Sequence, residues 1–264
     1  MLIIGERINA TRKRIGEAVQ GQDAELIKAE AVKQVEAGAN LIDVNGGIPG
    51  RETEFLLWLV DVVQGVVDVP LCLDSADADA LEAALPRCSR PPMVNSITFE
   101  QERLERVTPL ITEHDAKVIA LCLSDDGPPK DFDGRIDIAA RLVDRLTGDG
   151  VPLENIYVDP CVFPISTGSD VGSFVLDAIG QIHSQYPGVH TICGASNVSF
   201  GLPVRKLLNA TFLAMLIARG LDSAIIDPCN SLTRASVLAA EALAGRDDFC
   251  TSYIAAFRAG QLEV

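Results

Sequence analysis

Short apolar runs alternate with longer amphipathic stretches along the whole chain. Eight runs have the length and composition of buried strands: Leu2–Ile4, Leu41–Val44, Leu71–Leu73, Met93–Val94, Val118–Leu123, Ile156–Val158, His190–Cys193 and Ala224–Ile226. In a chain of 264 residues they recur about every 33 residues, which is the length of a strand, a helix and two loops. The pattern therefore predicts eight strand–helix units.

The stretches between these strands carry apolar residues at helical spacing. Ile136, Ala140, Val143 and Thr147 would share one helix face, with Ala139, Leu142 and Leu146 beside them. The charged residues of the same stretch fall on the opposite face. Residues 23–36 show a similar pattern, which stops before Gly38. Glycine adopts the left-handed conformation that often ends a helix, so this helix is expected to finish there.

One predicted helix is apolar on more than one face. The segment Phe55–Val60 reads FLLWLV and is apolar around its whole circumference, which exceeds what a single buried face requires. This excess predicts a contact with a second copy of the chain, and hence a homodimer. The alternative is a helix that is covered by a loop of its own chain.

The order of these elements indicates the fold class. Continuous apolar strands, each followed by a helix, are typical of an α/β protein with a parallel sheet covered by helices. Eight units without a domain-sized linker favour a (β/α)8 TIM barrel, forming a single domain over residues 1–264. The alternative is an open Rossmann-type sheet with an appendage, but no GxGxxG motif follows the first strand.

Composition narrows the class of protein. Acidic residues outnumber basic ones by 37 to 22, which gives a formal charge of −15 and argues against binding to a nucleic-acid backbone. None of the seven cysteines is paired in CxxC or CxxxC spacing, a usage that predicts reduced thiols in a cytoplasmic protein. Apolar runs such as Phe55–Val60 are too short to span a bilayer.

Polar residues recur where the apolar strands end, which in a barrel is the face that carries the active site. They are carboxylates and carboxamides rather than histidines: Glu6, Asn9, Asp43, Asp74, Asn95, Asp159, Asn197 and Asp227. The three histidines fall at helix ends or at a strand start, and no HExxH, Ser/His/Asp or P-loop pattern occurs. Zinc, triad and nucleotide chemistry are therefore disfavoured.

The carboxamides among these residues favour a neutral heterocycle rich in hydrogen-bond donors, although several aspartates are also compatible with magnesium. A pterin is such a heterocycle. Its 2-amino and ring N–H groups form a guanidine-like edge that matches the two oxygens of a carboxylate. Its other edge mixes donors and acceptors, which the two ends of an Asn amide can recognise.

Several motifs resemble one family in order along nearly the whole chain. They are GERIN at Gly5–Asn9, LCLDS at Leu71–Ser75, NS at Asn95–Ser96, YVDP at Tyr157–Pro160, SNVSFGLP at Ser196–Pro203 and LLNATFLAMLIARGLDSAIIDP at Leu207–Pro228. Together they resemble the pterin-binding methyltransferases. This family includes methyltetrahydrofolate:corrinoid protein methyltransferases and the folate module of cobalamin-dependent methionine synthase. The SNVSFGLP block is the most specific of these motifs.

The resemblance implies roles for individual residues. Asp159 would hold the 2-amino and N3 edge of the pterin, Asn95 would read the ring, and Asp74 would act nearer the reactive ring. Asn197 would donate to N5, so Asn197 and Asp74 are the implied catalytic residues. Further implied pocket residues are Gly194, Ser196, Glu6, Asn9 and Asp43. The alternatives from the residues alone are helix caps for Asp74 and Asp159, and a left-handed turn for Asn197.

The same resemblance implies a substrate and a partner. The substrate would be tetrahydrofolate or its 5-methyl form, and a separate corrinoid protein would carry the cobalamin, because the chain has no DxHxxG corrinoid motif. No metal would be bound by this chain. The acidic loop Ser124–Lys130 departs from the family pattern and is a candidate for partner choice.

Two other functions remain open from the sequence. One is a dihydropteroate synthase-like enzyme, whose pattern places an Asn-Pro-Asp-Ser-Phe-type loop after the first strand, where this chain reads Asn9-Ala10-Thr11-Arg12. The other is a folate-binding module without catalysis, which would bind folate but exchange no methyl group.

Overall fold

All eight predicted apolar runs form strands in the computed structural model, which describes residues 1–262. The strands are β1 (Leu2–Asn9), β2 (Leu41–Asn45), β3 (Leu71–Asp74), β4 (Met93–Phe99), β5 (Lys117–Ser124), β6 (Ile156–Asp159), β7 (His190–Thr191) and β8 (Ser223–Ile226). They pair in parallel in the order β7-β6-β5-β4-β3-β2-β1-β8. A single parallel bridge between Gly194 and Ile225 joins the two ends of the sheet, so the predicted single-domain α/β barrel is confirmed in nearly closed form.

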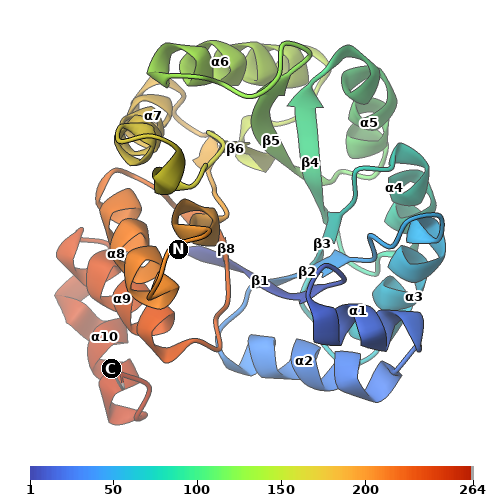
Figure 1. The fold of residues 1–264 in the computed structure, drawn as a ribbon, viewed down its shortest axis with the longest axis horizontal. Helices are drawn as coiled ribbons and strands as arrows, with labels where there is room; N and C mark the ends of the chain where they lie inside the picture. The colour runs from blue at the N-terminus through green and yellow to red at the C-terminus, as the bar shows by residue number, and fades with distance from the viewer. Residues whose placement is uncertain (263–264) are drawn as a thin grey trace.

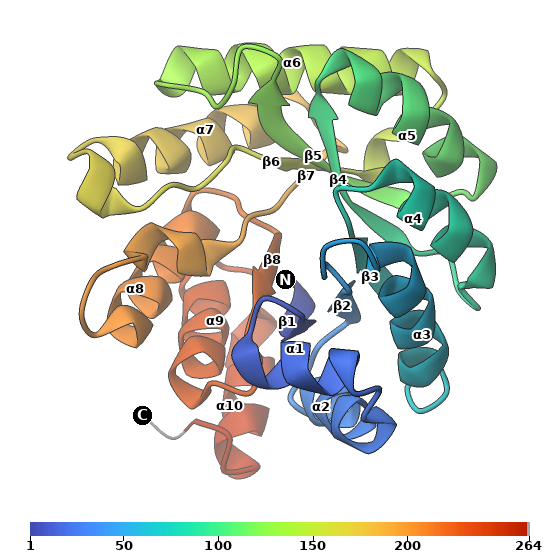
Figure 2. The ribbon, with the colours of Figure 1, turned by 45° about the vertical axis from the view of Figure 1, so that its right-hand side comes forward.

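Helices surround the strands in chain order (Figure 1). They are α1 (Lys13–Gln20), α2 (Ala24–Glu36), α3 (Glu52–Gln64), α4 (Ala78–Ala84), α5 (Gln101–Glu113), α6 (Phe132–Gly148), α7 (Val171–Gln185), α8 (Arg205–Ala218), α9 (Ser231–Leu243) and α10 (Thr251–Arg258). The last of them, α10, lies outside the ring against α9 (Figures 1 and 2). Among residues 1–262, no helix combines the length and apolar character needed to cross a membrane.

The helix boundaries follow local capping chemistry. Asp23 accepts a hydrogen bond from the Leu26 amide at 3.1 Å and starts α2, and Gly38 follows its end with a φ of +100°, as predicted. In α6 the predicted residues Ala139, Leu142, Val143 and Leu146 are buried, and the stripe differs from the predicted one at its start. Ile138, which the sequence pattern had not assigned, is buried, and Ile136 is only partly buried.

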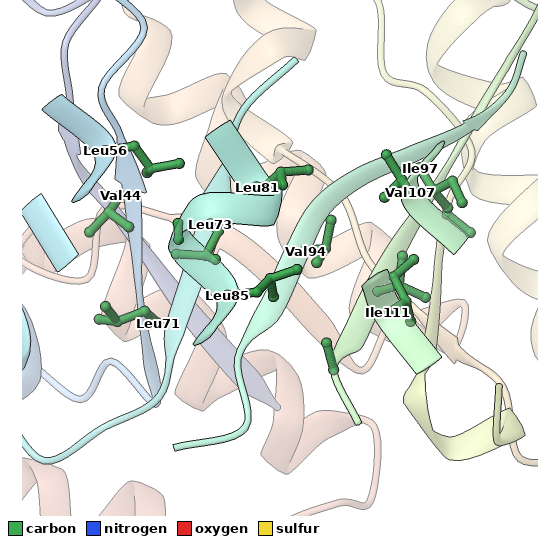
Figure 3. Packing of buried hydrophobic residues seen from close by; sticks show 14 of the residues in the cluster. Val44, Leu56, Leu71, Leu73, Leu81, Leu85, Val94, Ile97, Val107 and Ile111 are labelled. Atoms are coloured by element: carbon green, nitrogen blue, oxygen red, sulfur yellow. The ribbon is translucent and has the colours of Figure 1, made fainter. Parts of the chain in front are cut away.

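The outer core lies between the strands and the helices. Leu56 of α3, Leu81 of α4 and Val107 of α5 point toward the strands, where Leu73 and Val94 meet them (Figure 3). Burying such side chains stabilises the fold by roughly 1.5–3 kcal/mol each.

The apolar helix α3 is mostly covered within its own chain. Phe55, Leu56, Leu59 and Val60 are fully buried, and the remaining pair, Leu57 and Trp58, packs partly against the same core. Neighbouring helices and strands thus account for most of the apolar surface on which the predicted dimer rests.

A second, smaller core fills the inside of the barrel. Its fully or nearly fully buried side chains come from seven consecutive strands or their ends: Ile4, Leu41, Cys72, Met93, Ile119, Tyr157 and Ile192. Side chains along a strand alternate between the two faces of the sheet, so the next side chain to point inward comes two residues later. This apolar layer therefore forms a floor, and the side chains two residues further along each strand lie directly above it.

Candidate functional site

A polar ring lies directly above the apolar floor of the barrel. Counting two residues on from the seven floor residues gives Glu6, Asp43, Asp74, Asn95, Asp159 and Gly194, and on β5 the apolar Leu121. Six of the predicted site residues therefore face the same mouth, because each follows an inward-pointing apolar residue by one full strand repeat. Asp74 and Asn95 are also direct register partners across β3 and β4.

Asp43 and Asn95 are joined although they lie 52 positions apart. The Asn95 Nδ2 donates to Asp43 Oδ1 at 3.2 Å. Burial and the neighbouring Asp74 carboxylate raise the pKa of Asp43 well above its usual range, against the opposing donation from Asn95. A buried carboxyl with a raised pKa can hold a proton near neutral pH, which is a common property of functional sites.

Asp74 is held by its neighbour on β2 rather than by the next helix. Asn45 Nδ2 donates to Asp74 Oδ2 at 2.9 Å, whereas Asp77 caps α4 by accepting from the Asp79 amide at 2.9 Å. Burial raises the pKa of Asp74, and the hydrogen bond from Asn45 opposes that shift. The cap role considered for Asp74 thus belongs to Asp77, which leaves an oxygen of Asp74 available to a ligand.

Asp159, the last residue of β6, contributes a buried carboxylate to the ring. Its Oδ1 accepts a hydrogen bond from the Cys161 amide at 2.8 Å, and the Gly194 amide also stabilises its charged form. Burial nevertheless raises its pKa to about 7 because it outweighs these donors. No helix begins at Asp159, so its carboxylate is not a helix cap.

Glu6 and Ser196 border the ring on the β1 and β7 sides. The Arg12 guanidinium donates to Glu6 Oε1 at 2.6 Å, and the Ser196 hydroxyl lies 3.4 Å from Glu6 Oε2. Burial raises the pKa of Glu6 while Arg12 opposes the shift. Asn9 is engaged in its own loop, where its Oδ1 accepts from the Thr11 amide at 3.0 Å.

Asn197 lies in the short helix η4 (Ala195–Ser199), which follows β7. Its side chain is exposed at the rim of the mouth, and its backbone amide donates to the Gly194 carbonyl at 3.2 Å. A Cβ on Gly194 would stand 3.3 Å from Asn197 Nδ2. The glycine therefore lets the Asn197 amide approach the strand end, where the Gly194 amide also holds Asp159.

Four residues that support this site are not among those predicted from the sequence: Asn45, Glu52, Arg103 and Arg135. Asp227, which the sequence placed at a strand end without a role in the pocket, follows the inward-pointing Ile225 by two residues and accepts from Arg7 at 3.0 Å. Arg103 donates to the carbonyls of Ser75 and Ser96 at 2.9 and 2.6 Å and so ties together the loops after β3 and β4.

The ring suits a neutral ligand rich in N–H donors. Several carboxylates and amides converge above an apolar floor, and the exposed rim at Asn197 leaves one side open. Within the described part of the chain, no group of three or more His, Cys, Asp and Glu side chains is placed to hold a metal ion.

Comparison with known proteins agrees with this chemistry. Residues 5–227 match the family model described as pterin binding enzyme, and the chain belongs to that family. Within it, the chain is 35% identical to the methylcorrinoid:tetrahydrofolate methyltransferase of Eubacterium limosum, over 99% of this chain and 98% of the relative. It is also 32% identical to methionine synthase of Mycobacterium tuberculosis over 86% of this chain, a match that spans 20% of that larger protein.

Solved structures of dihydropteroate synthase share the fold. The enzyme from Clostridium difficile superposes with a TM-score of 0.73 at 20% identity, covering 92% of this chain and 96% of that chain. The enzyme from Vibrio fischeri gives a TM-score of 0.70 at 16% identity, covering 92% of each chain. At these identities the likeness concerns the fold and not the reaction.

Proposed function

We propose that this protein is a methyltransferase that moves a methyl group between N5 of tetrahydrofolate and the cobalt of a corrinoid carried by a separate protein. The observation that carries the proposal is the convergence of Asp74, Asn95 and Asp159 at one mouth, with Asn197 at its open rim. The match to a methylcorrinoid:tetrahydrofolate methyltransferase over almost the whole of both chains supports it.

Asp159 would bind the guanidine-like edge of the pterin. Its carboxylate already accepts from the Cys161 amide and is stabilised by the Gly194 amide, so its remaining lone pairs are the acceptors open to the 2-amino and N3 groups. Asn95 and Asp74 would fix the ring from the β3–β4 side. The apolar floor excludes water from beneath the ring, which strengthens these hydrogen bonds.

Asn197 would act on N5, where the bond to the methyl group breaks or forms. When the methyl carbon leaves, N5 retains the electron pair of the broken bond, so negative charge develops on that nitrogen. A hydrogen bond from Asn197 Nδ2 that strengthens as this charge grows lowers the barrier. An amide is too weak an acid to give up its proton, and the proton that N5 finally takes is proposed to arrive through water.

The corrinoid protein would approach the open rim beside Asn197. The corrinoid supplies the cobalt centre that accepts or donates the methyl group, and this chain is proposed to bind no metal itself. The loop Ser124–Lys130, which follows β5 at the same end of the barrel, carries Asp125 and Asp126. We propose that this acidic loop contributes to the choice of partner through its charge.

Methyl exchange with free cob(I)alamin tests the function directly. Purified protein with 5-methyltetrahydrofolate and cob(I)alamin should form methylcobalamin, and the reverse mixture should form 5-methyltetrahydrofolate. Tight folate binding without exchange in either direction would instead support a binding module, and formation of pteroate from 4-aminobenzoate would support a synthase.

The affinity for folate is expected to depend on pH through Asp159. The pKa of its carboxyl is about 7 in the free protein, and the N–H donors of the pterin favour its ionised form, so binding lowers that pKa. The complex therefore holds fewer protons than the free protein, and affinity should be highest above pH 7 and fall by up to about tenfold per pH unit below it. Calorimetric titration over this range measures the slope, and a profile as flat as that of Asp159→Asn would contradict the assignment.

We also propose that the protein is a cytoplasmic homodimer. All seven cysteines are unpaired thiols, which supports a reducing compartment. Support for the dimer comes less from α3 than from the C-terminal apolar face, defined by Leu243, Phe249, Tyr253, Ile254 and Phe257. Phe249 and Phe257 are 97% and 70% exposed, and a cluster of exposed apolar residues often marks an interface.

Light scattering at micromolar concentration is expected to report a dimer for the unmodified protein. Replacing both Phe249 and Phe257 with Asp should give monomers, because two buried charges oppose association at an apolar interface. The matched control is Val66→Asp, another exposed apolar position, just beyond α3, which should leave the dimer intact. A monomer in the unmodified protein would refute the dimer, and dissociation by the control would place the interface at α3.

A further inference from the structure

Arg135 is a buried arginine that forms no ion pair. It lies in the first turn of α6, the helix that packs on β5 and β6 (Figure 1), and it is only 1% exposed. Two other arginines of the same helix, Arg141 and Arg145, are partly in solvent and each pairs with an aspartate. Arg135 pairs with no carboxylate anywhere in residues 1–262. A charge removed from water without a partner is costly, which indicates that this charge acts on another group.

The Arg135 guanidinium joins α6 to the loop after β6. Its Nη1 donates to the Asp131 carbonyl at 2.8 Å, and its Nη2 donates to the Cys161 carbonyl at 3.4 Å, which is a long hydrogen bond. The guanidinium carbon lies 5.7 Å from the centre of the Phe163 ring. Its Nε is buried and has no hydrogen-bond partner among the described residues. Backbone carbonyls thus hold the end of the side chain, and its charge is not neutralised by a carboxylate in contact with it.

Cys161 adopts a backbone conformation that is unfavourable for residues other than glycine. Its φ is +65°, in the left-handed region, where such residues persist only if surrounding contacts hold them. In this conformation its amide donates to Asp159 Oδ1 at 2.8 Å, while its carbonyl accepts from Arg135. One residue therefore connects the buried arginine to the carboxylate, with one backbone group turned to each.

Arg135 also supplies the one charge that acts on Asp159 within the described part of the chain. The other titratable groups around this carboxylate are three thiols, Cys122 on β5, Cys161 after β6 and Cys193 after β7. Burial raises the pKa of each thiol, that of Cys161 to about 12, so none is charged near neutral pH. Burial raises the pKa of Asp159 to about 7, against the opposing backbone donors and the charge of Arg135. A guanidinium stays protonated throughout this range.

The contacts and the charge of Arg135 converge on the same carboxylate. We infer that Arg135 is the positioning residue of Asp159: it holds the turn at Cys161 that donates to the carboxylate, and its charge keeps the carboxylate ionised for the N–H donors of the ligand. It acts through the Cys161 backbone and through its electric field, without touching the ligand. The inference rests on the proposed function, in which Asp159 binds the 2-amino edge of the pterin.

The affinity for 5-methyltetrahydrofolate, titrated as a function of pH, tests the charge. Without the guanidinium the Asp159 carboxylate takes up a proton more readily, so the pH below which affinity falls should move upward by about one unit. At pH 7 the variants Arg135→Met and Arg135→Gln should therefore bind about fivefold more weakly than the unmodified protein. At pH 9 the carboxylate is ionised in all of them, and only a loss of about twofold from the looser turn should remain.

Variants of Cys161 test the turn separately from the charge and do not require an Arg135 variant to fold. Valine is branched at Cβ and disfavours a positive φ, whereas glycine accepts it. Cys161→Val should turn its amide away from Asp159, so Cys161→Gly should bind folate about fivefold more tightly than Cys161→Val at pH 9, the usual effect of one hydrogen bond. Equal affinity of the two variants would overturn the positioning role of the turn.

The matched control is Arg145→Met, which removes a more exposed charge from the far end of the same helix and should leave the pH profile in place. A loss of affinity that is equal at every pH in the Arg135 variants would make Arg135 a structural residue and overturn the inference. An equal shift in the control would also overturn it, because the effect would then follow net charge. Normal folate binding and methyl exchange with an unmoved pH profile would refute only the role of Arg135, whereas failure of the unmodified protein to bind folate at any pH would refute the proposed function.

Discussion

Replacing Asn197 with Ala is expected to lower the rate of methyl transfer by about 10²–10³, which is the typical loss when one donor to a developing negative charge is removed. The side chain stands exposed at the rim, beside a glycine that lets its amide approach the end of β7. Because the proposed hydrogen bond strengthens as charge grows on N5, the rate should suffer more than the affinity for folate.

Single-turnover transfer from saturating 5-methyltetrahydrofolate to cob(I)alamin measures this rate, and a separate titration measures the affinity. The matched control is Asn155→Ala, at a half-buried asparagine before β6 and so at the opposite end of the barrel, which should change neither quantity. A normal single-turnover rate with weakened binding alone would make Asn197 a positioning residue, and Asp74 with an ordered water would be the next candidate for acting on N5.

Replacing Asp159 with Ala is expected to weaken folate binding by about 1.5–3 kcal/mol, the scale of a hydrogen bond to a charged group lost from a buried site. The expected loss is large because the carboxylate is only 8% exposed, so no water can replace it fully as the partner of the 2-amino group. The variant should also lose the dependence of affinity on pH.

Titration calorimetry with 5-methyltetrahydrofolate measures the change. Asp177→Asn is the control, because Asp177 forms an exposed ion pair with Arg219 on the outside of the barrel and should leave folate affinity unchanged. Unaltered affinity in Asp159→Ala would remove this carboxylate from the site. A comparable loss in the control would show that the effect is not specific to the pocket.

Most of the fold could be predicted because its signals are local. Each strand is a short apolar run and each helix has its own periodicity. The eight units can therefore be recognised from the local sequence, without knowing which elements they contact in the fold. In α6 the start of the buried stripe differs from the predicted one, because the exact orientation of a helix depends on what it packs against. Ile138 is buried in the core cluster and Ile136 only partly, and the sequence pattern does not distinguish them.

The residues of the candidate site that follow apolar strands could be predicted from the sequence. The residues whose role depends on burial in the folded chain could not. Asp74 and Asp159 end their strands, and Asn95 follows the predicted apolar run Met93–Val94 although β4 continues to Phe99. Their position on one barrel face follows from those apolar runs. Arg135 gave no such signal, since a charged residue in the first turn of a helix is expected at the surface. It is 1% exposed, its Nη2 lies 3.4 Å from the Cys161 carbonyl, and its charge opposes the raised pKa of Asp159.

The sequence by itself determined the eight strand–helix units, the polar character of the strand ends and the family resemblance. Each of these depends only on local patterns of residues that are close together in the sequence. Only the tertiary structure decided which strand ends meet. The donation from Asn95 to Asp43 spans 52 positions, and the contact between the Ser196 hydroxyl and Glu6 spans 190 positions. Such contacts arise when the barrel closes and brings distant segments together, and the same closure raises the pKa of its buried carboxyls.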